Sequence, residues 1–154
     1  MELIKELPAL GRDLGPGLIL IGLTSLAAIL VGCLFEEWET LPWMATATVS
    51  LCGIGLLLRF LPKTSKVPRT STSIAATALV WVIVGLCGSL PFLFTGMSFL
   101  DAAFESMSAW TGTGFSIVAD IESWPKTLLF WRSFMQWVGG LGIVAFTLTV
   151  ATRS

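Results

Sequence analysis

Apolar residues in this chain gather into long runs that contain no charge. Residues 18–35 (LILIGLTSLAAILVGCLF) and 41–58 form two such runs, and residues 74–100 form a third. A helix of about 20 apolar residues spans a bilayer, so each run predicts a transmembrane helix. Pro91 and Gly96 predict that the third helix ends near residue 94 and that the chain then turns.

A fourth helix is predicted over residues 125–152. It begins at Pro125, and proline is favoured at the first position of a helix. Lys126, Arg132 and Gln136 lie in its first half, so its most apolar part comes later, over residues 133–149. Of the four predicted membrane crossings, this helix is the one that contains charged residues.

A shorter segment lies between the third and fourth runs. Ser98 can cap a helix, and Asp101 three residues later completes a capping pattern at the positive end of the helix dipole. The helix predicted over residues 99–110 would be about 18 Å long, at 1.5 Å per residue, which is half a bilayer. Such a helix enters a membrane without crossing it.

The loop TGTGF, residues 111–115, follows this short helix. Non-helical backbone at membrane depth is tolerated where it lines a water-filled cavity. The two glycines can reach positive φ, and a row of carbonyls can then replace the water around a dehydrated cation. Thr111 and Thr113 would add oxygen ligands or hold the loop. The alternative is an external amphipathic helix with a Gly/Thr turn, anchored by Trp110 and Phe115, that binds no ion.

Composition supports a membrane protein and argues against several functions. Hydrophobic residues make up 55% of the 154 residues, charged residues 12%, and the mean hydropathy is +0.85. Histidine is absent and the three cysteines are isolated, so neither a nucleophile–base pair nor a metal cluster is indicated. We therefore expect no enzyme activity and, without a long basic run, no nucleic-acid partner.

The placement of charge predicts the topology. Residues 59–73 (RFLPKTSKVPRTSTS) contain four basic residues and no acid, which is typical of a cytoplasmic loop. The amino terminus of this multi-pass protein of the cell membrane is then cytoplasmic as well. Arg132 falls within the membrane, where a charge needs a partner. Its nearest expected partners are Asp101, Glu105 and Glu122.

Two stretches carry a family resemblance. FLDAAFESMSAWTGTGFS and WPKTLLFWRSFMQWVGGLGIV together resemble the first pore repeat of the Trk/Ktr/HKT superfamily of potassium transporters, most closely its TrkH branch. The resemblance implies an all-α membrane protein with four transmembrane helices, one re-entrant pore helix and a filter loop. Residues 1–73 would be the amino-terminal two-helix region with its basic loop. Residues 74–154 would be the pore repeat: outer helix 74–94, pore helix 99–110, filter 111–115 and inner helix 125–152.

The resemblance also assigns residues. It implies filter backbone that binds K+ at Thr111, Gly112, Thr113 and Gly114, with Gly114 matching the filter glycine of the family. At position 112 this chain has glycine where the family often has threonine. The residues implied to support the filter are Asp101, Glu105, Phe115, Arg132, Gly139, Gly140 and Gly142. No organic cofactor is expected.

The function implied is potassium uptake, with this chain supplying one of four filter loops. We expect it to be an amino-terminal fragment whose partners are the lipid bilayer, the remaining pore repeats of the same protein or a second subunit, and a cytosolic nucleotide-binding regulatory subunit. Two alternatives stay open. One is a short chain that self-assembles into a cation channel, and the other is a non-conducting module that binds a partner through the glycine face of residues 139–142.

Overall fold

The computed structural model describes residues 2–61 and 70–153, and the regular structure in these two ranges is all helical. The predicted basic loop, residues 59–73, falls largely outside them. The elements are α1 (Glu2–Thr24), α2 (Leu26–Leu34), α3 (Leu41–Arg59), α4 (Thr70–Ser89), η1 (Leu90–Thr95), α5 (Phe99–Trp110), η2 (Ile121–Ser123) and α6 (Lys126–Arg153).

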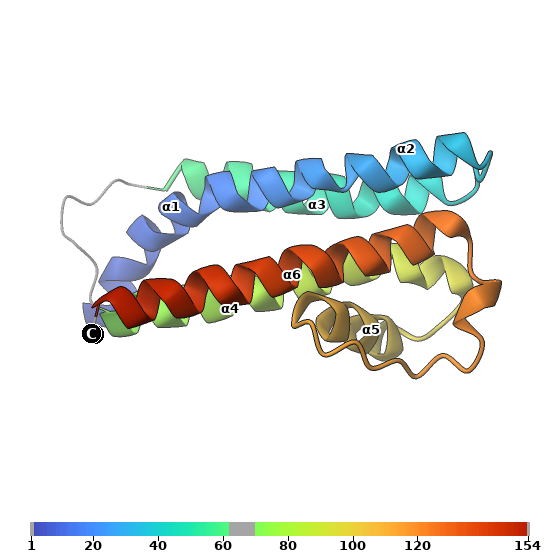
Figure 1. Ribbon diagram of the computed structural model, residues 1–154. Helices are drawn as coiled ribbons and strands as arrows, with labels where there is room; N and C mark the ends of the chain where they lie inside the picture. Colours follow the sequence, from blue (N-terminus) through green and yellow to red (C-terminus); the bar gives the residue numbers. More distant parts are fainter. Residues whose placement is uncertain (1, 62–69, 154) are drawn as a thin grey trace.

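The long helices run side by side, and α5 lies against one half of the bundle (Figure 1). Helix α1 packs on α3 and α4, while α5 packs between α4 and α6. Small residues permit the closest of these contacts. A Cβ added to Gly15 would lie 2.7 Å from the Gly55 carbonyl oxygen, and one added to Gly22 would lie 2.8 Å from the Cys52 sulfur. The α1–α3 pair is therefore held by direct backbone approach.

The first predicted helix, residues 18–35, differs from the structure in two ways. Helix α1 already begins at Glu2, and a break at Ser25 separates it from α2. The Ser25 hydroxyl is fully buried, donates to the Gly22 carbonyl at 2.6 Å and lies 2.5 Å from the Thr48 hydroxyl. A serine that bonds back to the preceding turn competes with the helix ladder and bends it.

Among the described residues, three segments are long and apolar enough to cross a membrane: Leu14–Leu34, Leu41–Arg59 and Ile74–Thr95. The third changes character at its end, because α4 stops at Ser89 and the tighter η1 helix continues to Thr95. Pro91 explains the change, since it lacks an N–H and clashes with the preceding turn. Gly96 closes η1 with φ of 80°, which confirms the predicted turn.

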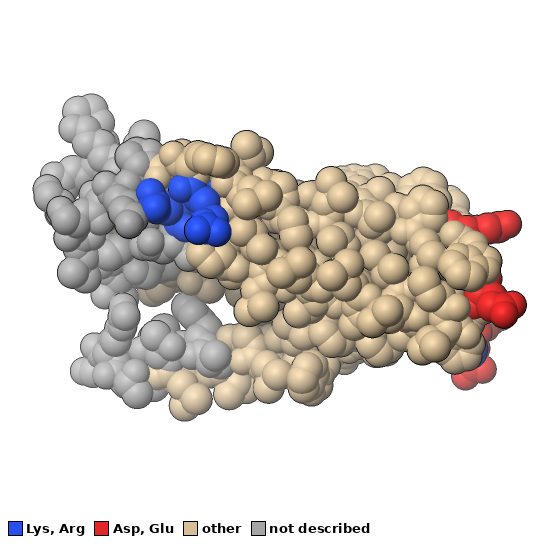
Figure 2. Space-filling model, turned by 90° about the horizontal axis from the view of Figure 1, so that it is seen from above, with Lys and Arg blue, Asp and Glu red and all other residues tan. Residues whose placement is uncertain are grey.

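Charge separates along the bundle. In Figure 2 acidic side chains gather at one end and basic side chains toward the other, with an uncharged band between them. The acidic end includes the α2–α3 connection, where Glu37 contacts the start of α6. At the opposite end Arg12 donates to the Leu61 carbonyl at 3.3 Å. A neutral band between charged ends is the surface that a bilayer requires.

Part of the buried core surrounds α5. Trp110 and Trp131 meet edge to face with ring centroids 6.2 Å apart, and Phe92 and Met135 are fully buried. The Trp131 indole also donates to the Gly88 carbonyl at 3.0 Å. Because α4, α5 and α6 all contribute to this cluster, it fixes the position of the loop that follows α5.

Candidate functional site

Helix α5 begins after the predicted cap at Ser98 and ends at Trp110. The Ser98 hydroxyl accepts from the Asp101 N–H at 3.2 Å and donates to the Asp101 carboxylate at 2.8 Å, which confirms the predicted cap. Asp101 therefore supports the start of α5 and does not pair with Arg132. At the other end Trp110 is buried, and the chain leaves the helix at Thr111.

Helix α6 approaches the end of α5 through a glycine. A Cβ added to Gly139 would overlap the Trp110 carbonyl group, so only glycine allows this contact. Gly142 is in ordinary contact range of the Trp81 ring, at 3.5 Å for an added Cβ. An added Cβ at Gly140 has no neighbour within 4 Å. The three predicted glycines thus have three different surroundings.

The loop after α5 is built on two glycines with left-handed backbone. Gly112 has φ of 72° and Gly114 has φ of 74°, a region that side chains disfavour. Its turns are closed by N–H bonds from Gly112 to Ala109 and from Gly114 to Ser108. A Cβ on Gly114 would also lie 2.8 Å from the Gln136 amide nitrogen. Position 114 is therefore restricted by both conformation and space.

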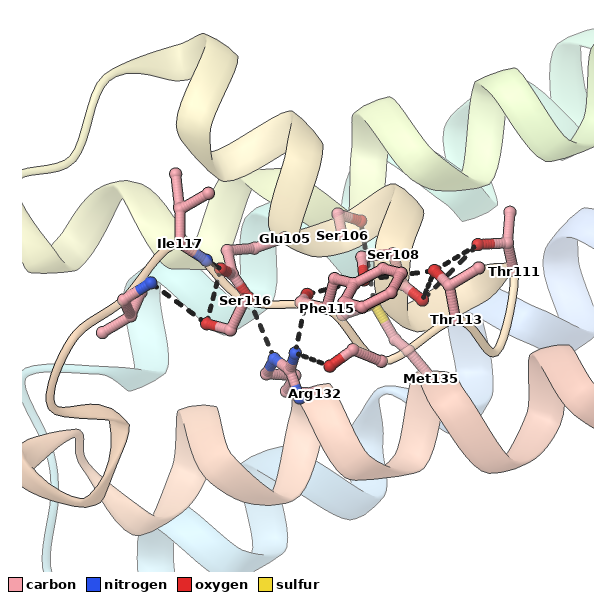
Figure 3. A network of polar contacts seen from close by, with 12 residues as sticks. Glu105, Ser106, Ser108, Thr111, Thr113, Phe115, Ser116, Ile117, Arg132 and Met135 are labelled. Atoms are coloured by element: carbon pink, nitrogen blue, oxygen red, sulfur yellow. Dashed lines mark hydrogen bonds and ion pairs between the residues drawn. The ribbon is translucent and has the colours of Figure 1, made fainter.

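Hydroxyl groups tie this loop back to α5 (Figure 3). Thr111 donates to the Met107 carbonyl at 2.8 Å and Thr113 donates to the Ser108 carbonyl at 3.1 Å. The Ser108 hydroxyl donates to the Phe115 carbonyl at 2.6 Å. Of the two roles that the sequence allowed for the threonine hydroxyls, these contacts favour holding the loop. The role of Ser108 in holding the loop was not predicted from the sequence, although this residue lies three positions before the predicted filter.

A buried ion pair holds the far side of the loop. Glu105 is fully buried, and its Oε2 accepts from the Arg132 Nε at 3.0 Å. Its Oε1 accepts from the Ser116 hydroxyl and the Ile117 N–H, both at 2.7 Å. The exposed Glu122 is thus not the partner, and Glu105 joins α5, α6 and the chain beyond the loop.

The same arginine also contacts the loop backbone (Figure 3). Its Nη2 donates to the Gly114 carbonyl at 3.2 Å and to the Phe115 carbonyl at 3.1 Å. The Phe115 side chain itself is 73% exposed. Arg132 therefore clamps the two carbonyls at the end of the loop.

The first three carbonyls of the loop differ from the two that Arg132 contacts. Within the described residues, no hydrogen bond reaches the carbonyl oxygens of Thr111, Gly112 and Thr113. Three consecutive unpaired carbonyls are oxygen ligands of the kind that hard alkali cations prefer. The Gly114 carbonyl was predicted as a fourth ligand, and it already accepts from a guanidinium.

Comparison with known proteins shows the family of this chain. The family model for TrkH, described as a cation transport protein, matches residues 43–153. The chain belongs to the TrkH family. It is 36% identical over 146 residues to the Trk system potassium uptake protein TrkH of Halomonas elongata, which covers 90% of this chain and 30% of that protein. An uncharacterised cation transporter of Methanocaldococcus jannaschii is 35% identical over 97% of this chain and 32% of its own length.

The fold also matches a solved TrkH structure. The crystal structure of the potassium transporter TrkH from Vibrio parahaemolyticus superimposes with a TM-score of 0.85 and 31% identity, over 94% of this chain and 32% of that one. The chain thus spans about a third of the length of these TrkH relatives. It is a multi-pass membrane protein of a transporter family and not an enzyme.

Proposed function

We propose that this chain forms one pore repeat of a K+ uptake protein, with α4 as outer helix, α5 as pore helix, residues 111–115 as filter loop and α6 as inner helix. The observation that carries the proposal is the run of three unpaired carbonyls at Thr111, Gly112 and Thr113, held between hydroxyl contacts to α5 and the Arg132 clamp. Two relatives, of Halomonas elongata and Vibrio parahaemolyticus, are named Trk system potassium uptake proteins.

The proposed topology places α6 as a fourth membrane crossing, with both its carboxyl end and the amino terminus in the cytoplasm. Its 28 residues give a length of about 42 Å at 1.5 Å per residue. Arg132 is the obstacle to this assignment, since a charge in the membrane is costly unless it is paired. The contact with Glu105 supplies that partner. The acidic end of the bundle would face outward and raise the local cation concentration.

One loop does not close a filter, because a K+ filter surrounds the ion with carbonyls from about four loops. We propose that further repeats, from the same polypeptide or from other subunits, cover the loop. Apolar side chains of the loop and of α6 are exposed in this chain and would face them: Phe115, Trp137, Leu141 and Val144. The proposed partners also include the bilayer and a cytosolic nucleotide-binding subunit at the basic loop.

The alternative of a partner docked on the glycine face is less well supported. Gly139 packs on Trp110 and Gly142 faces Trp81, so two of the three glycines make contacts inside the chain. These contacts favour a role for Gly139 in holding the inner helix against the pore helix, and for Gly142 in packing it on the outer helix.

A substitution at Gly114 tests the proposed filter. In the complete transporter, Gly114→Ser places a side chain at positive φ against Gln136, and we expect the K+ over Na+ uptake ratio to fall. Gly96→Ser is the matched control, because Gly96 also has positive φ (80°) but an added Cβ meets nothing within 4 Å. An unchanged ratio in Gly114→Ser, with the protein present in the membrane, would contradict the filter assignment.

A further inference from the structure

Glu37 reaches across the fold to the start of the inner helix. It lies in the α2–α3 connection, yet its Oε1 accepts from the Lys126 N–H at 2.7 Å and its Oε2 accepts from the Thr127 N–H at 2.8 Å. The Thr127 hydroxyl donates to the same Oε2 at 2.6 Å. Three donors at the first turn of α6 thus converge on one carboxylate that is 89 and 90 residues away along the chain.

Helix α6 has no cap of its own. The first four N–H groups of a helix need partners from outside its ladder. Here the Leu129 N–H makes the first bond of the ladder, to the Pro125 carbonyl, and the Leu128 N–H donates to the same oxygen. Pro125 precedes the helix and has no side-chain acceptor, so the first two N–H groups depend on Glu37. A carboxylate at this position also interacts favourably with the helix dipole.

The backbone around Glu37 is built to hold its side chain in place. Helix α2 ends with the Glu37 N–H donating to the Gly32 carbonyl at 2.9 Å and the Glu36 N–H donating to the Cys33 carbonyl at 3.3 Å. This is the Schellman pattern, in which the residue at the position of Glu36 is left-handed. Glu36 has φ of 57°, and glycine is the usual residue there. A non-glycine residue in this conformation is strained.

Gly32 of α2 leaves room for the Thr127 side chain. A Cβ added to Gly32 would lie 2.8 Å from the Thr127 hydroxyl oxygen, and the Thr127 side chain is fully buried. Burial raises the pKa of the Glu37 carboxyl. The hydrogen bonds from Thr127 and Lys126 and the Lys126 ammonium lower it more, so the pKa lies below its ordinary value. Glu37 is therefore ionised at neutral pH.

The start of α6 is close to the residue that holds the loop. Arg132 follows Thr127 by five residues, which is about 7.5 Å along the helix axis. Through Arg132, α6 holds the Gly114 and Phe115 carbonyls. A shift or rotation of the outer end of α6 would therefore move the clamp relative to the loop.

We propose that Glu37 is a positioning residue of the filter, which fixes the outer end of α6 and thereby the place at which Arg132 holds the loop. Glu37 lies outside the pore repeat, and among the described residues its side chain accepts hydrogen bonds from Lys126 and Thr127 and from none of residues 111–115, so it would act through α6. The inference rests on the proposed function, and it assigns to the amino-terminal helix pair a part in ion selection.

The test compares K+ and Na+ uptake by the complete transporter in membranes. Glu37→Gln keeps the shape of the side chain but leaves one oxygen to accept from three donors, and we expect the K+ over Na+ uptake ratio to fall about fivefold, at the lower end of coupling between separate sites. Thr127→Val removes the hydroxyl donor alone, and we expect a smaller fall. Glu39→Gln is the matched control, since Glu39 is exposed in the same connection, and its ratio should equal that of the wild type.

The outcomes separate this inference from the proposed function. If wild type prefers K+ and both Glu37→Gln and Thr127→Val keep its ratio, Glu37 has no positioning role, while the proposed filter stands. An equal loss of K+ and Na+ uptake in both variants would indicate a purely structural cap and would also overturn the inference. If wild type itself shows no preference for K+, the proposed function fails and the inference with it. Should Glu37→Gln not reach the membrane, Thr127→Val decides.

Discussion

Arg132 and Glu105 form an ion pair beside the loop, with 3.0 Å between the Arg132 Nε and the Glu105 Oε2. The Glu105 side chain is fully buried and that of Arg132 is 12% exposed. Each of the two also bonds to the chain at or after the loop: Arg132 to Gly114 and Phe115, and Glu105 to Ser116 and Ile117. The pair therefore joins α5, α6 and the loop at one point.

Removal of one partner should destabilise the protein strongly. Glu105→Ala leaves the Arg132 guanidinium unpaired in a largely buried position, a change that typically costs about 3–5 kcal/mol. We expect a clear fall in the midpoint of thermal unfolding, measured in detergent. Glu122→Ala removes an exposed acid from the connection between the loop and α6, and it should change the stability by less than about 0.5 kcal/mol. Equal effects of the two substitutions would argue against the ion pair.

Gly139 should tolerate no side chain. Gly139→Ala places a Cβ on the Trp110 carbonyl, so α6 must move away from α5, and overpacking of this kind costs about 1–3 kcal/mol. The control is Gly53→Ala in α3, where an added Cβ meets nothing within 4 Å. That control should be neutral or slightly stabilising, because alanine favours helix more than glycine does. Comparison of the two unfolding midpoints checks the prediction, which fails if Gly139→Ala is as stable as wild type.

Glu36 offers a stabilising substitution. Its φ of 57° costs about 1–2 kcal/mol for a residue with a side chain, and glycine removes that cost. Glycine also gains freedom in the unfolded chain, which offsets about 0.4–1 kcal/mol. We expect Glu36→Gly to raise the free energy of unfolding by about 0.5–1 kcal/mol, as measured by denaturant unfolding. A lower stability of Glu36→Gly would show that the Glu36 side chain contributes more than its backbone strain costs.

The contacts of Glu37 predict how stability depends on pH. Because its pKa is lowered in the folded protein, the stabilisation is fully present above the ordinary carboxyl pKa of about 4.3 and is lost as the pH falls through the lowered value. The difference in unfolding midpoint between wild type and Glu37→Gln should be constant from pH 5 to 8, as no part of it titrates there, and should shrink in more acidic solution. A difference that shrinks near neutral pH would contradict this interpretation.

Much of the fold follows from local sequence. The uncharged runs mark the membrane-length helices, because apolar length alone decides whether a segment can span a bilayer. The Ser98–Asp101 cap and the extent of α5 follow from residues three positions apart, and Gly96, Gly112 and Gly114 mark the places where the backbone turns left-handed. The TrkH resemblance was carried by two short strings of residues, and comparison confirms the family. The capping and glycine signals lie within about one turn of the features that they predict.

Other features were decided only by the tertiary structure. Sequence left Arg132 with three possible partners, and the packing of α5 against α6 brings Glu105 to it. The Ser25 hydroxyl contacts Thr48 of the neighbouring helix, and the cap of α6 depends on Glu37, which lies 89 residues before Lys126 in the chain. Gly139 and Gly140 look alike in the sequence, but only Gly139 meets a backbone. Periodicity and capping are properties of a single segment, whereas a partner for a buried charge or an uncapped helix is set by which segments pack together.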